Sequence, residues 1–289
     1  MTVVLVLGEI PSMVNTGYPS AIRVPVGAAG LSSAMQILEQ ARPGLTEHQA
    51  VLALYPAWRP DGAKSSIRFA RSMLSTDRIV PIPVRLPPLA FSLVADQLAF
   101  LAPYVGAGML VALADQLCKD VFAGAWVNSV ARLEHVKTGM VEHLSSYLPG
   151  SGFVVSATQR SGIHRITSAE PMMPDPFRPP APIQVLAAHG SGDLAWLQSK
   201  FGPALGAASV SIVGAQPLSP IFWGTEKYVE FVVFSGHPEA VRARAASIRC
   251  TPCGWCGEPI ASPVCSFCCM RQRALQVEGP PHQDALPAS

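Results

Sequence analysis

The sequence predicts an α/β domain, then a small α+β domain, and a separate cysteine-rich module at the C-terminal end. Three observations predict this organisation. Strand-like and helix-like segments alternate over the first 86 residues, and strands and helices follow in the order βαββα after residue 183. Six of the seven cysteines fall between Cys250 and Cys269. A chain of 289 residues is long enough for two domains, since one domain takes about 150 residues.

The composition excludes some classes of protein. Charged residues make up 14% of the chain and hydrophobic residues 49%. Disordered chains are rich in charge and poor in apolar residues, so a wholly disordered chain is excluded. The formal net charge of +2 is too small to indicate a polyanionic partner by itself. Any surface for nucleic acid would therefore be local.

The N-terminal segments have the periodicities of a layered α/β domain. Continuous valine-rich runs are typical of strands buried on both faces, and apolar residues at helical spacing indicate the helices between them. Pro81 and Pro83 lack the N–H group that a central strand needs, so the last strand is expected at a sheet edge. The predicted elements are strand Thr2–Gly8, helix Ala28–Ala41, strand Ala50–Ala57, helix Ser65–Leu74 and strand Arg78–Leu86.

A run of 18 uncharged residues, Gln97–Ala114, raises the question of a membrane span. A spanning helix needs about 20 predominantly apolar residues, and this run is interrupted by Pro103. We expect two buried helices that break near Pro103 and no transmembrane segment, with a membrane-associated hairpin as the alternative. The phrase Ala-Asp-Gln-Leu occurs twice here, at 95–98 and at 114–117.

A proline-rich segment marks the expected domain boundary. Six of the fifteen residues 169–183 are proline, which excludes a helix or an internal strand and predicts a semi-rigid linker. The α/β domain, with a helical second half, is assigned to 1–168. The α+β domain is assigned to 184–249, where the βαββα order resembles a ferredoxin-like fold. The cysteine module at 250–273 and a disordered tail at 274–289 follow.

The cysteine pattern points to a metal. No basic residue precedes the short N-terminal apolar run, so it does not resemble a signal peptide. We therefore expect a cytoplasmic, reducing location, where clustered cysteines bind metal rather than form disulfides. Zinc takes four thiolate or imidazole ligands in a tetrahedron, and a CxxC turn supplies two of them. Cys253 and Cys256, followed by Gly257, form one such turn, and Cys265 and Cys268 form a second.

These two turns resemble the short zinc-ribbon and zinc-knuckle modules, over about residues 250–273. The resemblance implies a zinc-ribbon-like module with zinc as its cofactor and Cys253, Cys256, Cys265 and Cys268 as ligands. Cys250 and Cys269 are alternative ligands, because Cys250 extends the series to CxxCxxC and Cys269 adjoins Cys268. Since iron–sulfur proteins also use the CxxCxxC spacing, an iron–sulfur cluster is the alternative cofactor.

Basic and aromatic residues lie around these cysteines. Arginines bind phosphates and exposed aromatic rings stack on bases, so we predict nucleic-acid contacts on this module. Phe267 is expected to be exposed beside Trp255. Protein–protein docking would use the same surface chemistry, and the alternative is that Arg242 and Arg244, on the preceding helix, simply solvate one helix face. The candidate contact residues are Arg249, Trp255, Arg271 and Arg273.

The sequence thus favours a non-enzymatic zinc-binding protein that mediates nucleic-acid or protein interaction, in replication, transfer or regulation in a high-GC bacterium. Two alternatives stay open. One is an enzyme with its pocket in the N-terminal α/β domain and the zinc module as an accessory; the other is an iron–sulfur or redox protein. No set of catalytic residues is identifiable, and Cys118 is expected to be a core residue.

Overall fold

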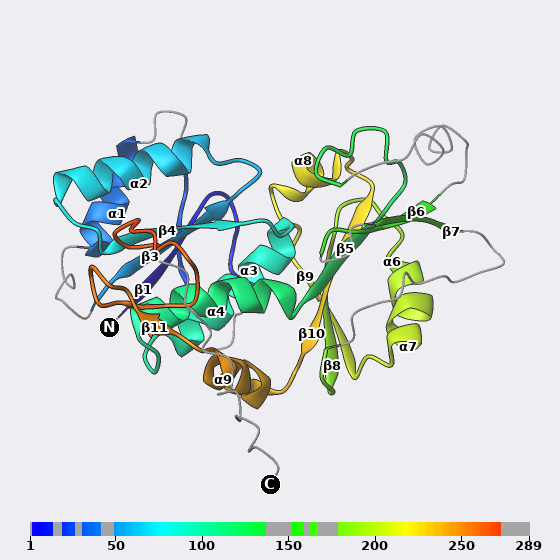
Figure 1. Cartoon of the computed structure of the whole chain (residues 1–289). Helices are drawn as coiled ribbons and strands as arrows, with labels where there is room; N and C mark the ends of the chain where they lie inside the picture. Colours follow the sequence, from blue (N-terminus) through cyan, green and yellow to red (C-terminus); the bar gives the residue numbers. More distant parts are fainter. Residues whose placement is uncertain are drawn as a thin grey trace, which may run out of the picture.

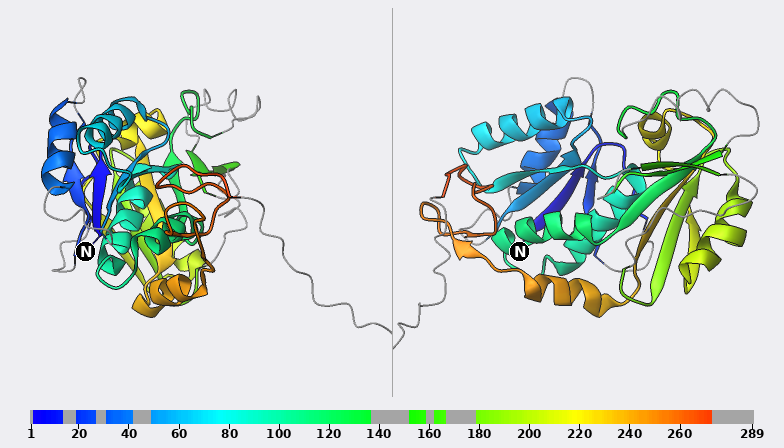
Figure 2. Two further views of the ribbon diagram at one scale, coloured as in Figure 1. Left: turned by 60° about the vertical axis from the view of Figure 1, so that its left-hand side comes forward. Right: turned by 45° about the vertical axis from the view of Figure 1, so that its right-hand side comes forward.

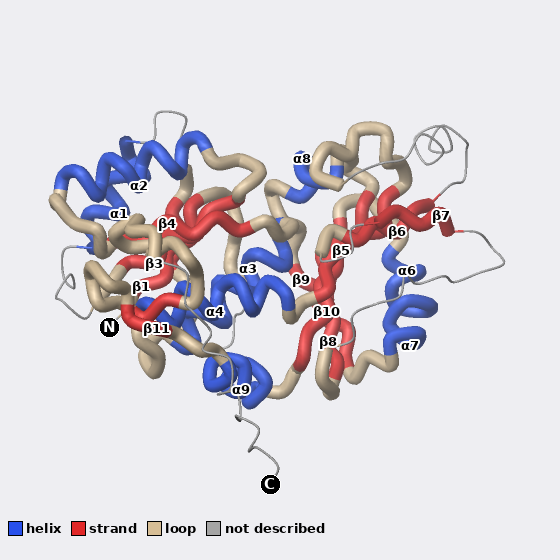
Figure 3. The backbone as a smooth tube through the Cα atoms, viewed as in Figure 1, coloured by secondary structure: helices blue, strands red, loops and turns tan. Residues whose placement is uncertain are grey.

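The computed structural model describes residues 2–13, 19–26, 31–41, 49–136, 152–158, 162–166 and 179–272. Two lobes lie side by side, each built on one β-sheet (Figure 1). Helices α3 and α4 lie between the two sheets, and the cysteine module lies against the first lobe (Figures 1 and 2). In the tube view the strands of both sheets are red and the helices packed around them are blue (Figure 3).

The first lobe is a parallel sheet with helices on both faces. Its strand order is β2-β1-β3-β4, with every neighbouring pair parallel. Successive side chains of a strand point to opposite faces. Leu5 and Leu7 accordingly pack with α1 and α2, whereas Val4 and Val6 pack with α3 and α4. The strands are β1 (Val3–Leu7), β2 (Ile22–Val24), β3 (Val51–Pro56) and β4 (Ile79–Val84), and the outer helices are α1 (Leu31–Ala41) and α2 (Asp61–Met73).

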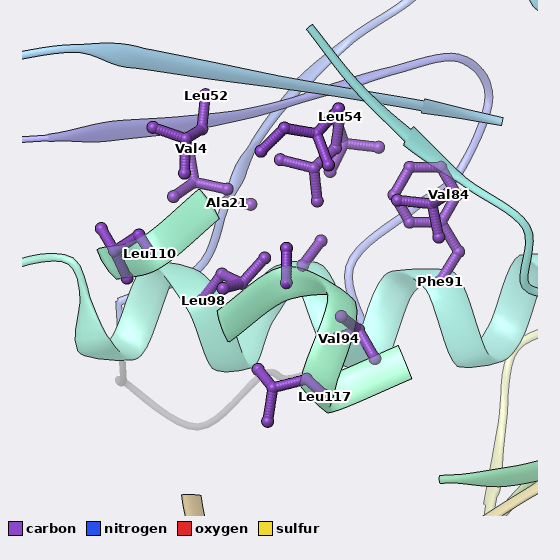
Figure 4. Close-up of a cluster of buried hydrophobic side chains, with 14 of the residues drawn as sticks. Val4, Ala21, Leu52, Leu54, Val84, Phe91, Val94, Leu98, Leu110 and Leu117 are labelled. Atoms are coloured by element: carbon purple, nitrogen blue, oxygen red, sulfur yellow. The ribbon is translucent and has the colours of Figure 1, made fainter. Parts of the chain in front are cut away.

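The proline-containing strand β4 lies at the edge of this sheet, as the sequence predicts. The two-helix prediction for the uncharged run is also confirmed, since α3 (Pro88–Leu101) ends before Pro103 and α4 (Ala107–Lys119) begins after it. No helix within the described residues is both long enough and apolar enough to cross a membrane. Instead, Phe91, Leu98 and Leu110 on these two helices form a core with the underside of the first sheet (Figure 4).

The second lobe is a six-stranded mixed sheet in the order β7-β6-β5-β10-β8-β9. All its pairs are antiparallel except β8 with β9. One face is covered by the helical run α6 (Leu194–Trp196), η1 (Leu197–Phe201) and α7 (Gly202–Leu205), and the other by α3 and α8 (Ser219–Trp223). The strands are β5 (Phe122–Val127), β6 (Gly152–Ser156), β7 (Gly162–Ile166), β8 (Ile183–His189), β9 (Ser209–Val213) and β10 (Tyr228–Ser235).

This sheet contradicts the predicted fold class of an α/β domain plus a small ferredoxin-like α+β domain and a zinc-ribbon-like module. β10, from the expected small domain at 184–249, pairs on one side with β8 and on the other with β5, which precedes the proline-rich segment. In the sequence, residues 169–183 therefore fall between β7 and the start of β8, which are two strands of one sheet, and not between two domains. The physical reason is that β5 and β10 are about a hundred residues apart, and no local pattern records which strand a buried strand will pair with.

The two lobes share one continuous core. The cluster around α3 and α4 includes Ala123, Ala188 and Val232 from the second sheet and Phe267 from the cysteine module. Helix α9 (Pro238–Ser247) then leads from β10 back across α4 to the module, where β11 (Thr251–Pro252) pairs with β12 (Pro259–Ile260). The expected tail at 274–289 and most of the linker lie outside the described residues.

Candidate metal centre and apolar cavities

The cysteine module, residues 250–272, contains two turns with the same backbone hydrogen bonds. In the first turn the Cys253 N–H donates to the Glu258 carbonyl at 2.8 Å, and the Gly257 N–H donates to the Cys253 carbonyl at 3.0 Å. In the second turn the Cys265 N–H donates to the Met270 carbonyl at 3.0 Å, and the Cys269 N–H donates to the Cys265 carbonyl at 2.9 Å. The two CxxC sequences therefore fold into equivalent loops, each of which curls two sulfurs toward one point.

The two loops face one another and bring four sulfurs together. The Cys253 and Cys268 sulfurs are 3.7 Å apart, and the Cys256 and Cys265 sulfurs are 3.6 Å apart. All four lie within 4.8 Å of one another. These are the four residues that the sequence analysis names first as ligands. The alternatives lie elsewhere: Cys250 contacts the Met109 sulfur at 3.8 Å, and the Cys269 side chain is exposed.

Backbone N–H groups point at these sulfurs. Those of Trp255 and Cys256 hydrogen-bond the Cys253 sulfur, and those of Phe267 and Cys268 hydrogen-bond the Cys265 sulfur. The Gln272 side-chain amide also lies 3.2 Å from the Cys253 sulfur. N–H donors stabilise negative charge on sulfur, so the loops suit thiolates.

Arginines of the first lobe hold the module in place. The Arg71 guanidinium, on α2, donates to the Phe267 carbonyl at 2.9 Å. Arg78, at the start of β4, forms an ion pair with Glu258 and lies over the Phe267 ring, 5.1 Å from its centroid. The ring itself is 1% exposed. The prediction that Phe267 is exposed is therefore wrong, because the ring is a core residue where the module meets the first lobe.

Helix α4 touches the module at a glycine. A Cβ atom on Gly108 would lie 2.2 Å from the Pro259 carbonyl oxygen, which is well inside the van der Waals contact distance of two non-bonded atoms. We expect Gly108→Ala to lower the free energy of unfolding by about 1–3 kcal/mol through this overlap. Gly214→Ala is the matched control, because a Cβ atom there meets nothing within 4 Å. Urea denaturation of both variants measures the difference, and equal stabilities would show that α4 and the module are not in close contact.

The predicted nucleic-acid contacts belong to the module or adjoin it in the sequence, and two further arginines of the local positive charge lie on α9. Arg249, Trp255 and Arg271 are exposed, with Trp255 74% exposed, and Arg273 lies outside the described residues. On α9, Arg242 donates to Glu239 at 2.6 Å, and Arg244 forms a bidentate pair with Asp120 at 2.5 and 2.6 Å. These two arginines are therefore already paired with carboxylates.

Two apolar cavities flank α4. The first, the module cavity, has a volume of about 390 Å³ and lies between β4, α4 and the module. Cys118 lines it, and burial, with a contribution from Asp115, raises the pKa of this thiol to about 12. The Cys118 side chain is therefore a neutral thiol at physiological pH and a poor nucleophile.

The second cavity, the α9 cavity, has a volume of about 670 Å³. It lies between α9, the ends of α3 and α4, and the end of β10. Its wall is mostly apolar, and its charged groups include Arg244, Asp120 and Glu239. The apolar residues are Leu117, Val121, Pro180, Ala181, Phe234, Ala240, Val241 and Ala243. The hydrogen bond to Asp120 is the main reason that the pKa of Arg244 is raised, so Arg244 stays charged and its charge is balanced by Asp120 in the same wall.

A buried carboxylate lies between the lobes. Glu230, in the middle of β10, is fully buried and accepts hydrogen bonds from the Leu89 N–H of α3, at 2.9 Å, and from the Ser219 hydroxyl of α8. Burial raises the pKa of Glu230 to about 7. Sequence analysis missed this residue. The sequence signal that could have predicted its burial is the alternation of β10, which places Glu230 on the same face as Tyr228 and Val232. Both of these neighbours are buried.

No model of a protein family matches the sequence, and no curated protein matches it. Solved structures do match. A DegV family protein from Corynebacterium glutamicum has a TM-score of 0.56 and 14% identity, with 82% of this chain and 97% of that chain covered. A DegV family protein from Thermus thermophilus, described by its fatty acid binding, has a TM-score of 0.51 and 14% identity, with 73% of this chain and 78% of that chain covered. The fatty acid kinase B3 protein of Streptococcus pneumoniae, loaded with linoleic acid, has a TM-score of 0.50 and 10% identity, with 80% of this chain and 99% of that chain covered.

These matches contradict the function predicted from the sequence, which was nucleic-acid or protein interaction through a zinc module. They cover 73–82% of the chain, and two of the three proteins above are described by a fatty acid. The cysteine module, on which that prediction rested, is a small part of the structure. The ring of Phe267, which was expected to stack on a base, is instead buried in the core. The chain has the two-lobed fold of the DegV proteins.

Proposed function

We propose that this protein binds a long-chain fatty acid in the α9 cavity. The observation that carries the proposal is the cavity itself, because 670 Å³ falls within the 300–1,000 Å³ of typical ligand sites, which are mostly apolar with a few polar groups. The fold supports it, since proteins of this fold from Thermus thermophilus and Streptococcus pneumoniae are described with fatty acids.

The wall of the cavity matches the two parts of such a ligand. Leu117, Phe234 and Val241 offer apolar surface to a hydrocarbon chain. Arg244 offers a cation to the carboxylate. Its pair with Asp120 uses two of the five guanidinium N–H donors, so donors are left for a ligand. We therefore place the carboxylate at Arg244 and the chain along the apolar wall.

Filling the cavity tests the position of the chain. Ala240 and Ala246 both lie on α9, but Ala240 lines the cavity and Ala246 is exposed away from it. We expect Ala240→Trp to weaken binding of stearic acid at least about tenfold, since each displaced methylene costs about 0.8 kcal/mol of burial. Ala246→Trp is the matched control and should leave the affinity unchanged. Calorimetry on delipidated protein measures both, and equal affinities would place the ligand elsewhere.

Replacing the cation tests the position of the carboxylate. Arg244→Gln should reduce the preference for stearic acid over stearyl alcohol, because a charge-assisted hydrogen bond is lost. Arg242→Gln removes an exposed arginine of the same helix that does not line the cavity, so it should keep the preference. A wild-type protein that binds neither compound would refute the proposed function.

The cytoplasmic location expected from the sequence stays part of this proposal. It is supported by the four module sulfurs, which gather around one point instead of joining in bonded pairs. A protein partner also stays a proposal, since a protein that buries its ligand needs a means of delivering it.

A further inference from the structure

We propose that the cysteine module holds one tetrahedral Zn²⁺ ion, and that this ion fastens the module to the first lobe. The proposal is independent of lipid binding. The four thiolate ligands are Cys253, Cys256, Cys265 and Cys268.

The distances between the sulfurs suit a single ion. Four sulfurs at about 2.3 Å from one Zn²⁺ ion lie about 3.8 Å from one another. Two of the distances across the loops are 3.6 and 3.7 Å, and no pair exceeds 4.8 Å. A disulfide would bring two sulfurs to about 2.05 Å, so these cysteines are not bonded in pairs. In an iron–sulfur cluster the four thiolates are divided between at least two irons, so some pairs of sulfurs lie farther apart than around one tetrahedral ion, and the four sulfurs here are too close together for that.

Hydrogen-bond donors in the loops stabilise the negative charge of such a centre. Four thiolates and one Zn²⁺ ion carry a net charge of −2. The N–H groups on the Cys253 and Cys265 sulfurs, a further N–H from Glu258 on the Cys256 sulfur, and the Gln272 amide all donate toward it. Such donors orient the ligands and stabilise the bound metal.

Cys269 has a different role, which the second loop explains. In the first loop the residue after the second cysteine is Gly257, with φ +73°. Cys269 occupies the equivalent position of the second loop with φ +59°, a left-handed conformation that favours glycine. The backbone therefore turns at Cys269, and its exposed side chain points away from the other sulfurs. We infer that Cys269 can be replaced by glycine without loss of the metal.

The module needs the ion because it has almost no core of its own. Its strand pairs are only two residues long, and its buried apolar side chains, apart from cysteines, are Ile260 and Phe267. A segment of this size cannot bury enough surface to fold alone, so metal binding supplies the missing free energy. The ion in turn positions Phe267 beneath Arg78 and closes one wall of the module cavity.

Metal content of the full chain tests the proposal. The protein is purified with reductant from zinc-supplemented medium, and elemental analysis and native mass spectrometry count the ions. We expect one zinc per chain and a colourless protein. Cys256→Ser and Cys268→Ser should each lose the zinc. Cys250→Ser and Cys269→Gly, the matched controls, should keep it.

A second measurement covers the case in which the serine variants do not fold. Titrating the wild-type thiols with a mercurial reagent should release one zinc as the four ligand thiols react, and chelation should lower the midpoint of thermal unfolding. A metal-free protein, zinc loss in Cys250→Ser or Cys269→Gly, or a brown protein with several irons and sulfide would overturn the proposal. None of these measurements involves lipid, so a negative result would refute the zinc site without refuting fatty acid binding.

Discussion

Replacing Asp96 by alanine is expected to lower the free energy of unfolding by about 3–5 kcal/mol. Asp96, on α3, is 5% exposed and accepts hydrogen bonds from Ser12, from the Ala21 N–H, and from both Nη atoms of Arg23 at 2.9 and 3.1 Å. Removing one partner of a buried ion pair leaves the other charge unpaired, which costs about this much. Chemical denaturation of both proteins measures the change.

Asp115 provides the control. It lies in the second copy of the Ala-Asp-Gln-Leu phrase and pairs with Lys119, but both side chains are more than half exposed. Exposed pairs contribute about 0–1 kcal/mol, so Asp115→Ala should have a small effect. The double replacement Arg23→Met with Asp96→Leu should cost less than Asp96→Ala alone, because no unpaired charge is left. Similar losses for Asp96→Ala and Asp115→Ala would show that the Asp96 network does not hold α3 to the first sheet.

Glu230 is expected to make stability fall as pH rises from about 5 to 8. Burial raises its pKa to about 7 from an ordinary value of 4.5. Below 4.5 both the folded and the unfolded chain hold the proton, and the stability is fully present. Between 4.5 and 7 the unfolded chain releases the proton while the folded chain keeps it, so stability is lost until pH passes the folded pKa. The loss approaches about 3 kcal/mol.

Glu230→Gln isolates this effect from other titrating groups. The amide has the same shape and can keep the contacts with the Leu89 N–H and the Ser219 hydroxyl, but it does not titrate. We expect the difference in unfolding free energy between wild type and variant to change by about 2.5 kcal/mol between pH 5 and pH 8. Urea denaturation across this range measures it. Parallel profiles for the two proteins would show that Glu230 has an ordinary pKa.

Local patterns in the sequence predicted the first lobe and the cysteine loops. Continuous apolar runs, alternation and helical spacing locate β1, β3, β4, α1 and α2, and the prolines of β4 indicate its edge position. The three-residue strand β2 was not predicted. The break near Pro103 predicts α3 and α4. These features depend on residues that are close in sequence, and so they can be read without the fold.

The second sheet could not be predicted in this way. β5 was assigned to a helical stretch, because Phe122–Val127 is a short apolar run between helical segments and carries no alternation. Its partner β10 shows clear alternation, but alternation reveals a buried face and not the neighbouring strand. The α9 cavity is likewise formed by segments from four parts of the chain, so no local sequence motif predicts it.

By itself, the sequence determined two CxxC loops and the order of elements in the first lobe apart from β2, because these features arise from near neighbours along the backbone. Only the tertiary structure decided which four sulfurs meet, since Cys250 and Cys269 differ from the other four in where the fold places them. The same holds for the two Ala-Asp-Gln-Leu phrases. Their aspartates are identical in local sequence, yet Asp96 is buried against Arg23 and Asp115 is exposed. Burial depends on what packs against a residue from distant parts of the chain, and that is set by the whole fold.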